Sequence, residues 1–497
     1  MMRQFRLVVI LLASVPALFS CVSASREGLP PGSPFAEASF ASANLLPQGI
    51  AVGDVTSRSA LLWLRTDGPT AVQFEWAPVA AWDVASKMAT AVAPVARTPL
   101  FTTGPETDFT LAVPIEGLIP ATRYRYYVFV GTKGREGTPT EARVAARGEF
   151  TTLPDVRTQA PVTFAWSGDL GGQGRCRRGA AGYPIFDVMR AQQLDFFLFL
   201  GDTIYSDSLC PSPPNEPGAD FLATTLAEYR ARHRYQRGAE SLRRFLETTP
   251  VWVIWDDHEV RNDFSGPFDS RMAVGRQALL EYWPIRAAVD DPLRLYRTVH
   301  AGADLELFIL DTRQYRSRNV DQDGPAKTML GEKQLQWLLS GLAESTATWK
   351  VIVTTVPLSI PKGGSIIVPG NDGWAGGRVY PGFEWERQVL VDHIVGRRMK
   401  NVVFLAGDVH HVQANAYDPN GDEIPDFHEF VAGPLSAASD RSTPASEGLR
   451  PTTLINEHGY FNFGLIRVTR SSFDVKILDD AGATRFSYRL SARSPSE

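Results

Sequence analysis

Four apolar segments of the 497-residue chain each end in acidic or histidine side chains: "VTFAWSGD", "DFFLFLGDTIYSD", "VWVIWDDHEVRND" and "NVVFLAGDVHH". The polar residues at these ends are Asp169, Asp202, Tyr205, Asp257, His258, Asn262, Asp408, His410 and His411. Carboxylates, imidazoles and phenolates are metal ligands, and one such segment alone would be weak evidence. Four of them within one region predict a site for more than one metal ion.

The side chains divide into two sets by the metal that each would suit. One set mixes carboxylate, phenolate and imidazole, as a trivalent or borderline transition ion prefers: Asp169, Asp202, Tyr205 and His410. The other is nearly all oxygen, as Ca²⁺ prefers: Asp257, Asp408, a shared Asp202 and, as a further candidate, Asn262. Two cations about 3.5–4 Å apart would activate a water and clamp a phosphoryl group. His258 could then protonate the leaving alkoxide as a general acid.

Apolar strands alternate with helix-like stretches from residue 161 to 497, which predicts an α/β domain with layered sheets. In such sheets ligands gather outside the carboxyl ends of the strands. Strand ends that are far apart in the sequence can therefore meet in one crevice. The last segment, "GYFNFGLIRVTRSSFDVKILDDAGATRFSYRLS", predicts a terminal hairpin that completes one sheet.

Residues 45–154 have a different pattern. Short runs such as "SALLWLRT", "AVQFEWA" and "TRYRYYVFVG" alternate apolar and polar residues and are separated by Gly, Pro and Asp. This pattern predicts a small all-β sandwich, and it contains no cluster of catalytic residue types. A short linker between Pro154 and Pro161 separates it from the α/β domain.

Residues 1–21 predict an export signal, because Arg3 and Arg6 precede an apolar run and small residues precede Cys21. "LFSC" resembles the bacterial lipobox, whose cysteine is lipidated; plain secretory cleavage is the alternative. Either reading places the mature chain in the bacterial cell envelope or periplasm, with membrane contact through a lipid anchor only. The net charge of −5 gives no reason to expect nucleic acid as a partner.

Two further cysteines, Cys176 and Cys210, follow Asp169 and Asp202 by seven or eight residues. Outside the cytoplasm they could form a disulfide that joins two loops of the site. A metal-binding thiolate and two free thiols are the other readings.

The order Asp169, "GDTIY", "DDHE" and "GDVHH" resembles the calcineurin-like metallophosphoesterases, and specifically the PhoD-like alkaline phosphatase and phosphodiesterase family. "YRTVHAGADLELFILDTRQYRSR", "NDGWAGG" and "EFVAGPLSA" extend the resemblance, and the N-terminal strands resemble a fibronectin-III-like module. The resemblance implies an αββα sandwich preceded by that module. It also implies Fe³⁺ on the first set of ligands, Ca²⁺ or another divalent metal on the second, and His258 as the proton donor.

Several positions depart from the family pattern. Gly171 stands where the common first motif has a histidine, Asp257 where it has the asparagine of Gly-Asn-His, and Asp408 where it has the first histidine of Gly-His-x-His. "VTTVPLSIP" also lacks the histidine of the fourth motif. Each change replaces a nitrogen ligand by oxygen or removes it. This favours Ca²⁺ over Zn²⁺ at the second metal position.

Three residues that do not belong to the four strand-end segments are candidates for substrate contact. Arg297 and Arg313 could bind phosphate by paired hydrogen bonds, although arginines beside a strand commonly form ion pairs. Trp374 lies in a Gly-rich segment that could cover the crevice.

These features predict an exported hydrolase that cleaves phosphomonoesters, phosphodiesters or both through a metal-bound hydroxide. Its substrate would be a small-molecule or lipid phosphate ester. A phospholipase-like or nucleotide-directed phosphodiesterase is the alternative, and a non-catalytic calcium-binding envelope protein is a third reading.

Overall fold

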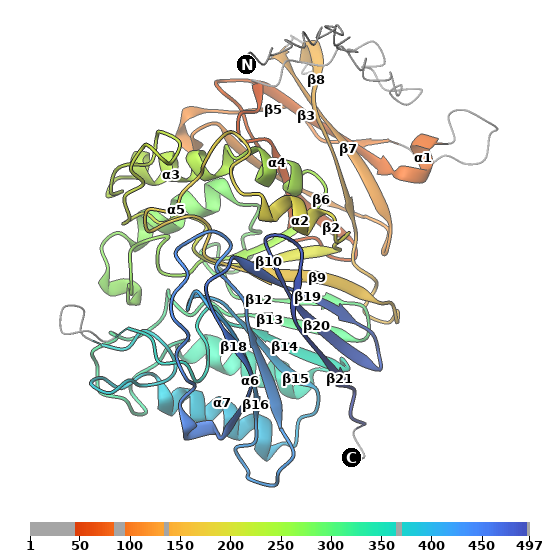
Figure 1. Ribbon diagram of the computed structural model, residues 1–497. Coiled ribbons are helices and arrows are strands. Elements are labelled where there is room, and N and C mark those ends of the chain that lie inside the picture. The colour runs from red at the N-terminus through yellow and green to blue at the C-terminus, as the bar shows by residue number, and fades with distance from the viewer. Residues whose placement is uncertain (1–44, 84–94, 134–138, 364–369, 495–497) are drawn as a thin grey trace, which may run out of the picture.

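The computed structural model describes residues 45–83, 95–133, 139–363 and 370–494. Two large sheets lie one above the other (Figure 1), with helices α2 to α5 on the outer side of one and α6 and α7 on the outer side of the other. This is the predicted order of layers, helix, sheet, sheet, helix. The export signal and Cys21 lie outside the described residues. Among the described helices, none has the length and apolar character that crossing a bilayer requires.

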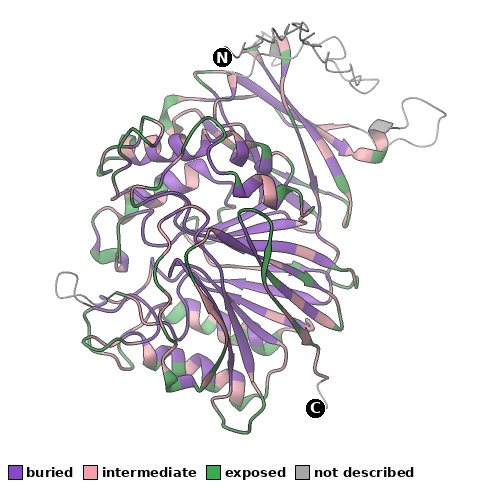
Figure 2. Cartoon of the chain, viewed as in Figure 1, coloured by how far each residue is buried: buried purple, intermediate pink, exposed green. Residues whose placement is uncertain are grey.

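The first sheet has nine strands, in spatial order β21 (Thr484–Ser491), β20 (Ser472–Asp479), β19 (Asn462–Val468), β9 (Val162–Ser167), β10 (Phe196–Leu200), β11 (Val251–Ile254), β1 (Ile50–Gly53), β2 (Ser59–Arg65) and β6 (Thr110–Glu116). β9, β10 and β11 run parallel to one another. Their continuous apolar sequences are buried, as expected for parallel strands covered on both faces (Figure 2). The three central strands therefore hold their carboxyl ends at one edge.

The second sheet has seven strands, in the order β12 (Arg297–Ala301), β13 (Leu305–Ile309), β14 (Trp349–Val353), β15 (Val402–Ala406), β17 (Phe427–Val431), β16 (Val412–Tyr417) and β18 (Pro451–Glu457). Side chains alternate along β13: Leu305, Leu307 and Ile309 pack in the core between the two sheets. Phe308 and the following Leu310 pack instead with residues of α6 and α7. Because side chains alternate between the two faces of a strand, β13 contributes to both hydrophobic cores.

The helices are α1 (Val79–Asp83), α2 (Ile185–Arg190), α3 (Leu226–Arg237), α4 (Glu240–Leu246), α5 (Met272–Tyr282), α6 (Glu332–Glu344) and α7 (Glu384–Gly396). α6 buries Leu338 and Leu342, four residues apart, against the second sheet. α3 begins at Thr225, whose side chain accepts from the Glu228 backbone in a reciprocal capping box.

The N-terminal strands form two layers around one core, and one of these layers continues into the nine-stranded sheet. β1 pairs in parallel with β11 through Gly53 and Val251, so β1, β2 and β6 extend the nine-stranded sheet. The third sheet consists of β4 (Ala96–Arg97), β3 (Ala71–Pro78), β7 (Arg123–Lys133) and β8 (Pro139–Thr151), with β5 (Phe101–Thr102) beside β3. Leu62 of β2, Phe74 of β3 and Val128 of β7 share one core. The predicted second layer exists, but its partner layer belongs to the large sheet.

Candidate metal centre

Four candidate ligands lie shortly after three strands whose carboxyl ends converge. Asp169 follows β9, Asp202 follows β10, and Asp408 and His410 follow β15 of the other sheet. All four have positive φ, between 52° and 68°. Non-glycine residues rarely adopt this conformation, and it clusters at functional sites. The chain therefore turns sharply after each strand and directs the polar side chain toward the space between the sheets.

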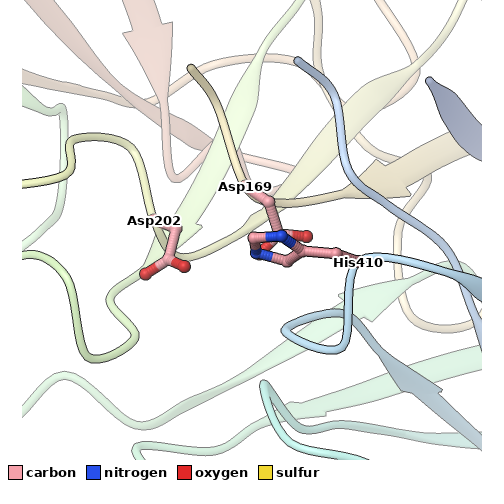
Figure 3. Close-up of side chains that lie close together, drawn as sticks. All are labelled: Asp169, Asp202 and His410. Atoms are coloured by element: carbon pink, nitrogen blue, oxygen red, sulfur yellow. The ribbon is translucent and has the colours of Figure 1, made fainter. Parts of the chain in front are cut away.

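Asp169, Asp202 and His410 offer ligand atoms that lie within 4.8 Å of one another (Figure 3). His410 donates from Nδ1 to the carbonyl of Ala438 at 2.6 Å, which leaves Nε2 free of hydrogen and 3.5 Å from Asp169 Oδ1. The Tyr205 hydroxyl donates to the same Nε2 at 2.8 Å. We call Asp169, Asp202, Tyr205 and His410 the first cluster.

The carboxylates of this region carry oxygens that no protein group satisfies. Both oxygens of Asp169 and one oxygen each of Asp202, Asp257 and Asp408 are buried without a hydrogen-bond partner. Burial, together with the charges of Asp257, Asp256 and Asp169, raises the pKa of Asp202 well above its ordinary value. Native proteins rarely leave such groups unsatisfied, so the donor set fits metal ions.

The second cluster consists of Asp256, Asp257 and Asp408, whose oxygens also lie within 4.8 Å of one another. Asp202 connects the two clusters, because it groups with Asp257 as well. Arg313 lies fully buried beside the second cluster, with Nε 2.6 Å from Asp256 Oδ1 and Nη2 3.5 Å from Asp408 Oδ1. Arg313 is therefore held by carboxylates, as an ion-pair partner, and not left free for phosphate.

Lys362 supplies a further cation to the second cluster. Its Nζ lies 2.5 Å from Asp408 Oδ1 and 2.8 Å from the Asp408 carbonyl oxygen. Burial alone would raise the pKa of Asp257, but His258, Arg313 and Lys362 outweigh burial and lower it. Asp257 is thus ionised and available as a ligand.

His258 lies between the clusters and a third carboxylate. Its Nδ1 donates to Asp207 Oδ1 at 2.6 Å, and its Nε2 lies 3.9 Å from Asp257 Oδ1. The ring packs on Tyr205 at a centroid distance of 4.2 Å. Burial lowers the pKa of His258, but Asp257 and Asp207 outweigh this and raise it to about 9. The imidazole is therefore protonated at neutral pH, and its Nε2 side faces Asp257.

Glu259 fixes two of the strand ends relative to each other. Its Oε2 accepts from the backbone of Asp202 at 3.1 Å and of Asp256 at 2.8 Å. Its Oε1 accepts from the backbone and the hydroxyl of Thr203 at 2.6 and 2.7 Å. One buried carboxylate thereby joins the loop after β10 to the loop after β11.

Four other predicted residues lie apart from the ligand groups. Asn262 is exposed, and its backbone donates to Asp207. His411 is buried and donates from Nδ1 to the carbonyl of Val409 at 2.8 Å, away from the ligand groups of the described residues. Arg297 pairs with Asp54 at 2.8 Å and stacks over Trp252.

Trp374 is buried in the core beneath the second sheet, where its indole N–H faces the Thr354 hydroxyl at 3.4 Å. This placement corrects the expectation that it covers the crevice, because a core side chain has no face toward substrate. Arg297 is likewise corrected: its guanidinium is occupied by Asp54 and by the Val253 carbonyl.

Cys176 and Cys210 form a disulfide. It joins the loop after Asp169 to the loop after Asp202, so that both are held close to the first cluster. The sequence left a disulfide, a metal-binding thiolate and two free thiols open, and the structure contains the disulfide.

Sequence reasoning missed Asp207, Glu259 and Lys362. Asp207 and Glu259 stand within the polar segments that follow β10 and β11, next to residues that were singled out. Their presence in those segments was the available signal. Lys362 follows a strand without any acidic or histidine signature, so nothing in the local sequence pointed to it.

Comparisons with known proteins agree with this geometry. Residues 165–476 match the model of the PhoD-like phosphatase family, and residues 33–154 match the model of its N-terminal domain. Alkaline phosphatase D of Bacillus subtilis (strain 168) is 30% identical across 73% of this chain. The match spans 64% of that protein, less than two thirds of its length.

Two solved structures share the fold. A PhoD structure superposes with a TM-score of 0.69 at 22% identity, covering 91% of this chain and 94% of that one. A purple acid phosphatase from yellow lupin (Lupinus luteus) seeds superposes with a TM-score of 0.60 at 12% identity, covering 90% and 75%. With strand ends, buried carboxylates and both family matches in agreement, the chain belongs to the PhoD-like phosphatase family.

Proposed function

We propose that this protein is a metal-dependent hydrolase of phosphate esters, acting on phosphomonoesters, phosphodiesters or both. The observation that carries the proposal is the set of buried, unsatisfied carboxylate oxygens beside the protonated His258. Stability alone gives no reason to bury so many ionised groups together, since each loses its hydration. Family membership supports the same chemistry.

The two clusters differ in the metal that each would hold. The first would hold Fe³⁺, because phenolate, imidazole and two carboxylates suit a trivalent ion: Asp169, Asp202, Tyr205 and His410. The second would hold Ca²⁺ or another divalent metal through Asp257, Asp408 and the shared Asp202. When bound, two such ions polarise phosphoryl oxygens and lower the pKa of a water.

The side chains around the metal groups prepare the site for proton transfer. His258 holds a proton beside the second cluster and would deliver it to the leaving oxygen of the ester. Asp207 orients the ring by accepting from Nδ1, so that Nε2 is the nitrogen directed inward. Glu259 keeps the loops that carry Asp202 and Asp256 in register.

We also propose that the mature protein is exported, with residues 1–21 as the signal and Cys21 as the lipid anchor. The sequence of the leader supports this, and the Cys176–Cys210 disulfide supports an oxidising compartment. Residues 45–154 would form the family's N-terminal domain, and their relation to fibronectin-III modules stays a proposal.

The test combines metal content with hydrolysis. The chain without residues 1–21 is compared with Asp202→Ala, which removes the shared ligand, and with Asp392→Ala, which removes an exposed carboxylate of α7. We expect the parent and Asp392→Ala to contain metal and to hydrolyse p-nitrophenyl phosphate or bis(p-nitrophenyl) phosphate. Asp202→Ala should lose both properties. A parent chain that binds no metal after reconstitution, or an active Asp202→Ala, would refute the proposal.

A further inference from the structure

The two clusters differ in how the protein itself balances their charge. Among the described residues, no lysine or arginine pairs with Asp169 or Asp202, whose neighbours are His410, His258, Tyr205 and other acids. The second cluster is different, because Arg313 and Lys362 both approach Asp408. The first cluster thus depends mainly on a metal ion for its charge balance, whereas the second already contains two positive side chains.

Lys362 is held in place from two sides. Its carbonyl oxygen accepts a hydrogen bond from the backbone N–H of Asp372 at 2.9 Å, and the next residue, Gly363, forms an isolated β-bridge with Asn371. Its ammonium group donates to Asp408 through both the side chain and the main chain. The position of Nζ against Asp408 is therefore a consequence of the local fold and not of a freely moving surface chain.

The side chains of Arg313 and Lys362 differ in how easily they could move away from Asp408. The Arg313 side chain is fully buried and pairs with Asp256 and Asp372 at 2.6 Å each, so its removal would break two buried ion pairs. The Lys362 side chain is 21% exposed, and a lysine stem is flexible. Lys362 is the cation that can withdraw toward solvent while the cluster stays intact.

A divalent metal at the second cluster must share Asp408 with this ammonium group. Both need the same buried carboxylate, and two positive charges a few ångströms apart repel each other strongly in a site with little water. Asp408 Oδ2 is free for the metal, but repulsion from the Lys362 ammonium group on Oδ1, or the free energy of moving that group away, is subtracted from the metal affinity.

We infer that Lys362 is an internal competitor for the second metal position, which makes this position an exchangeable divalent-cation site beside a tightly held first metal. The inference rests on the proposed function, because it takes the two clusters to be metal sites. It assigns Lys362 as a residue that sets cation affinity through Asp408.

Calcium binding to the full mature chain, with iron loaded at the first cluster, tests the inference. Equilibrium dialysis with ⁴⁵Ca²⁺ measures affinity, and elemental analysis measures iron, for the parent, Lys362→Met and Lys362→Arg. We expect Lys362→Met to bind calcium about 5- to 150-fold more tightly, the usual range of coupling between two sites, with unchanged iron. Lys362→Arg keeps the charge and should stay near the parent.

Lys350→Met is the matched control, because Lys350 is partly buried at the start of β14 and donates to the Ala347 carbonyl, not to an acid of the clusters. It should leave calcium affinity unchanged. Should Lys362→Met fail to fold, Lys362→Gln replaces it in the same assay. Calcium affinity of the neutral variant equal to or weaker than that of the parent overturns the inference while the proposed function stands. A parent that binds neither iron nor calcium overturns the proposed function itself.

Discussion

Replacing Glu259 by glutamine should weaken both the fold and the metal centre. The carboxylate accepts four hydrogen bonds, two on each oxygen, from Asp202, Thr203 and Asp256. A glutamine NH₂ group on the Asp202 and Asp256 side would face two backbone donors, and on the Thr203 side it would face one, because the Thr203 hydroxyl can turn and accept. Each hydrogen bond to a charged group contributes about 1.5–3 kcal/mol, so the loss of one costs at least that much. Native domains are stable by only about 5–15 kcal/mol, so the change is large.

The assay is urea unfolding combined with metal titration, and Glu386→Gln is the matched control. Glu386 is also buried and accepts from the backbone of Met329 and Leu330 and from the Thr328 hydroxyl, none of which belongs to an acidic cluster. Both variants should lose stability. Only Glu259→Gln should lose about 10- to 100-fold in metal affinity, as when a ligand's supporting hydrogen bonds are removed. Parent-like stability, or equal metal affinity in the two variants, would refute the role given to Glu259.

Two further predictions concern stability away from the acidic clusters. Burial and the nearby Arg237 lower the pKa of His233 to about 3, below the roughly 6.5 of an unfolded chain. The unfolded state therefore binds the proton first as pH falls. The free energy of unfolding should decrease as pH drops below about 6.5. His233→Phe, which keeps the ring stacked on Tyr282, should therefore lose about 2 kcal/mol less stability than the parent between pH 6.5 and 4.5 in urea unfolding; an identical pH dependence would contradict this. The disulfide closes a loop of 34 residues. The double variant Cys176→Ser, Cys210→Ser should therefore be less stable by about 4 kcal/mol in the same assay. An unchanged urea midpoint of unfolding would rule out this contribution.

The clustering of these acidic side chains could be predicted because their local signal is strong. A buried parallel strand reads as a continuous apolar run, and Gly-Asp directly after it marks where the backbone must turn. Asp202 after β10 and Asp408 after β15 were both found in this way. The rule that the carboxyl ends of parallel strands line one edge brings Asp169 and Asp202 together, whereas Asp408 lies on the other sheet and joins them through the stacking of the two sheets.

The supporting residues could not be predicted, because their roles depend on contacts between loops. Asp207 reaches His258 across 51 residues of sequence, and Lys362 reaches Asp408 across 46. Periodicity describes a single element and carries no information about which loops face each other. For the same reason Trp374 was assigned to a surface, although the fold of its loop buries it.

The boundary between the N-terminal β strands and the large sheet could not be predicted from the sequence either. The strand pattern of residues 45–154 describes local alternation correctly, but the pairing of Gly53 with Val251 joins segments about two hundred residues apart. The edge of β1 looks like the edge of any sandwich strand in the sequence, and only the three-dimensional arrangement shows that β11 lies beside it.

The place of β9, β10 and β11 within their sheet has a consequence for the order of events during synthesis. β11 is flanked by β1, which leaves the ribosome early, and β9 is flanked by β19, which leaves it near the end. A nascent chain that stops short of β19 leaves β9 paired with β10 alone and its other edge open. Asp169 therefore gains the last support of its strand late, after nearly all of the described chain has been made. Under the proposed export, the compartment in which folding finishes would then decide which metal ions this ligand set first encounters.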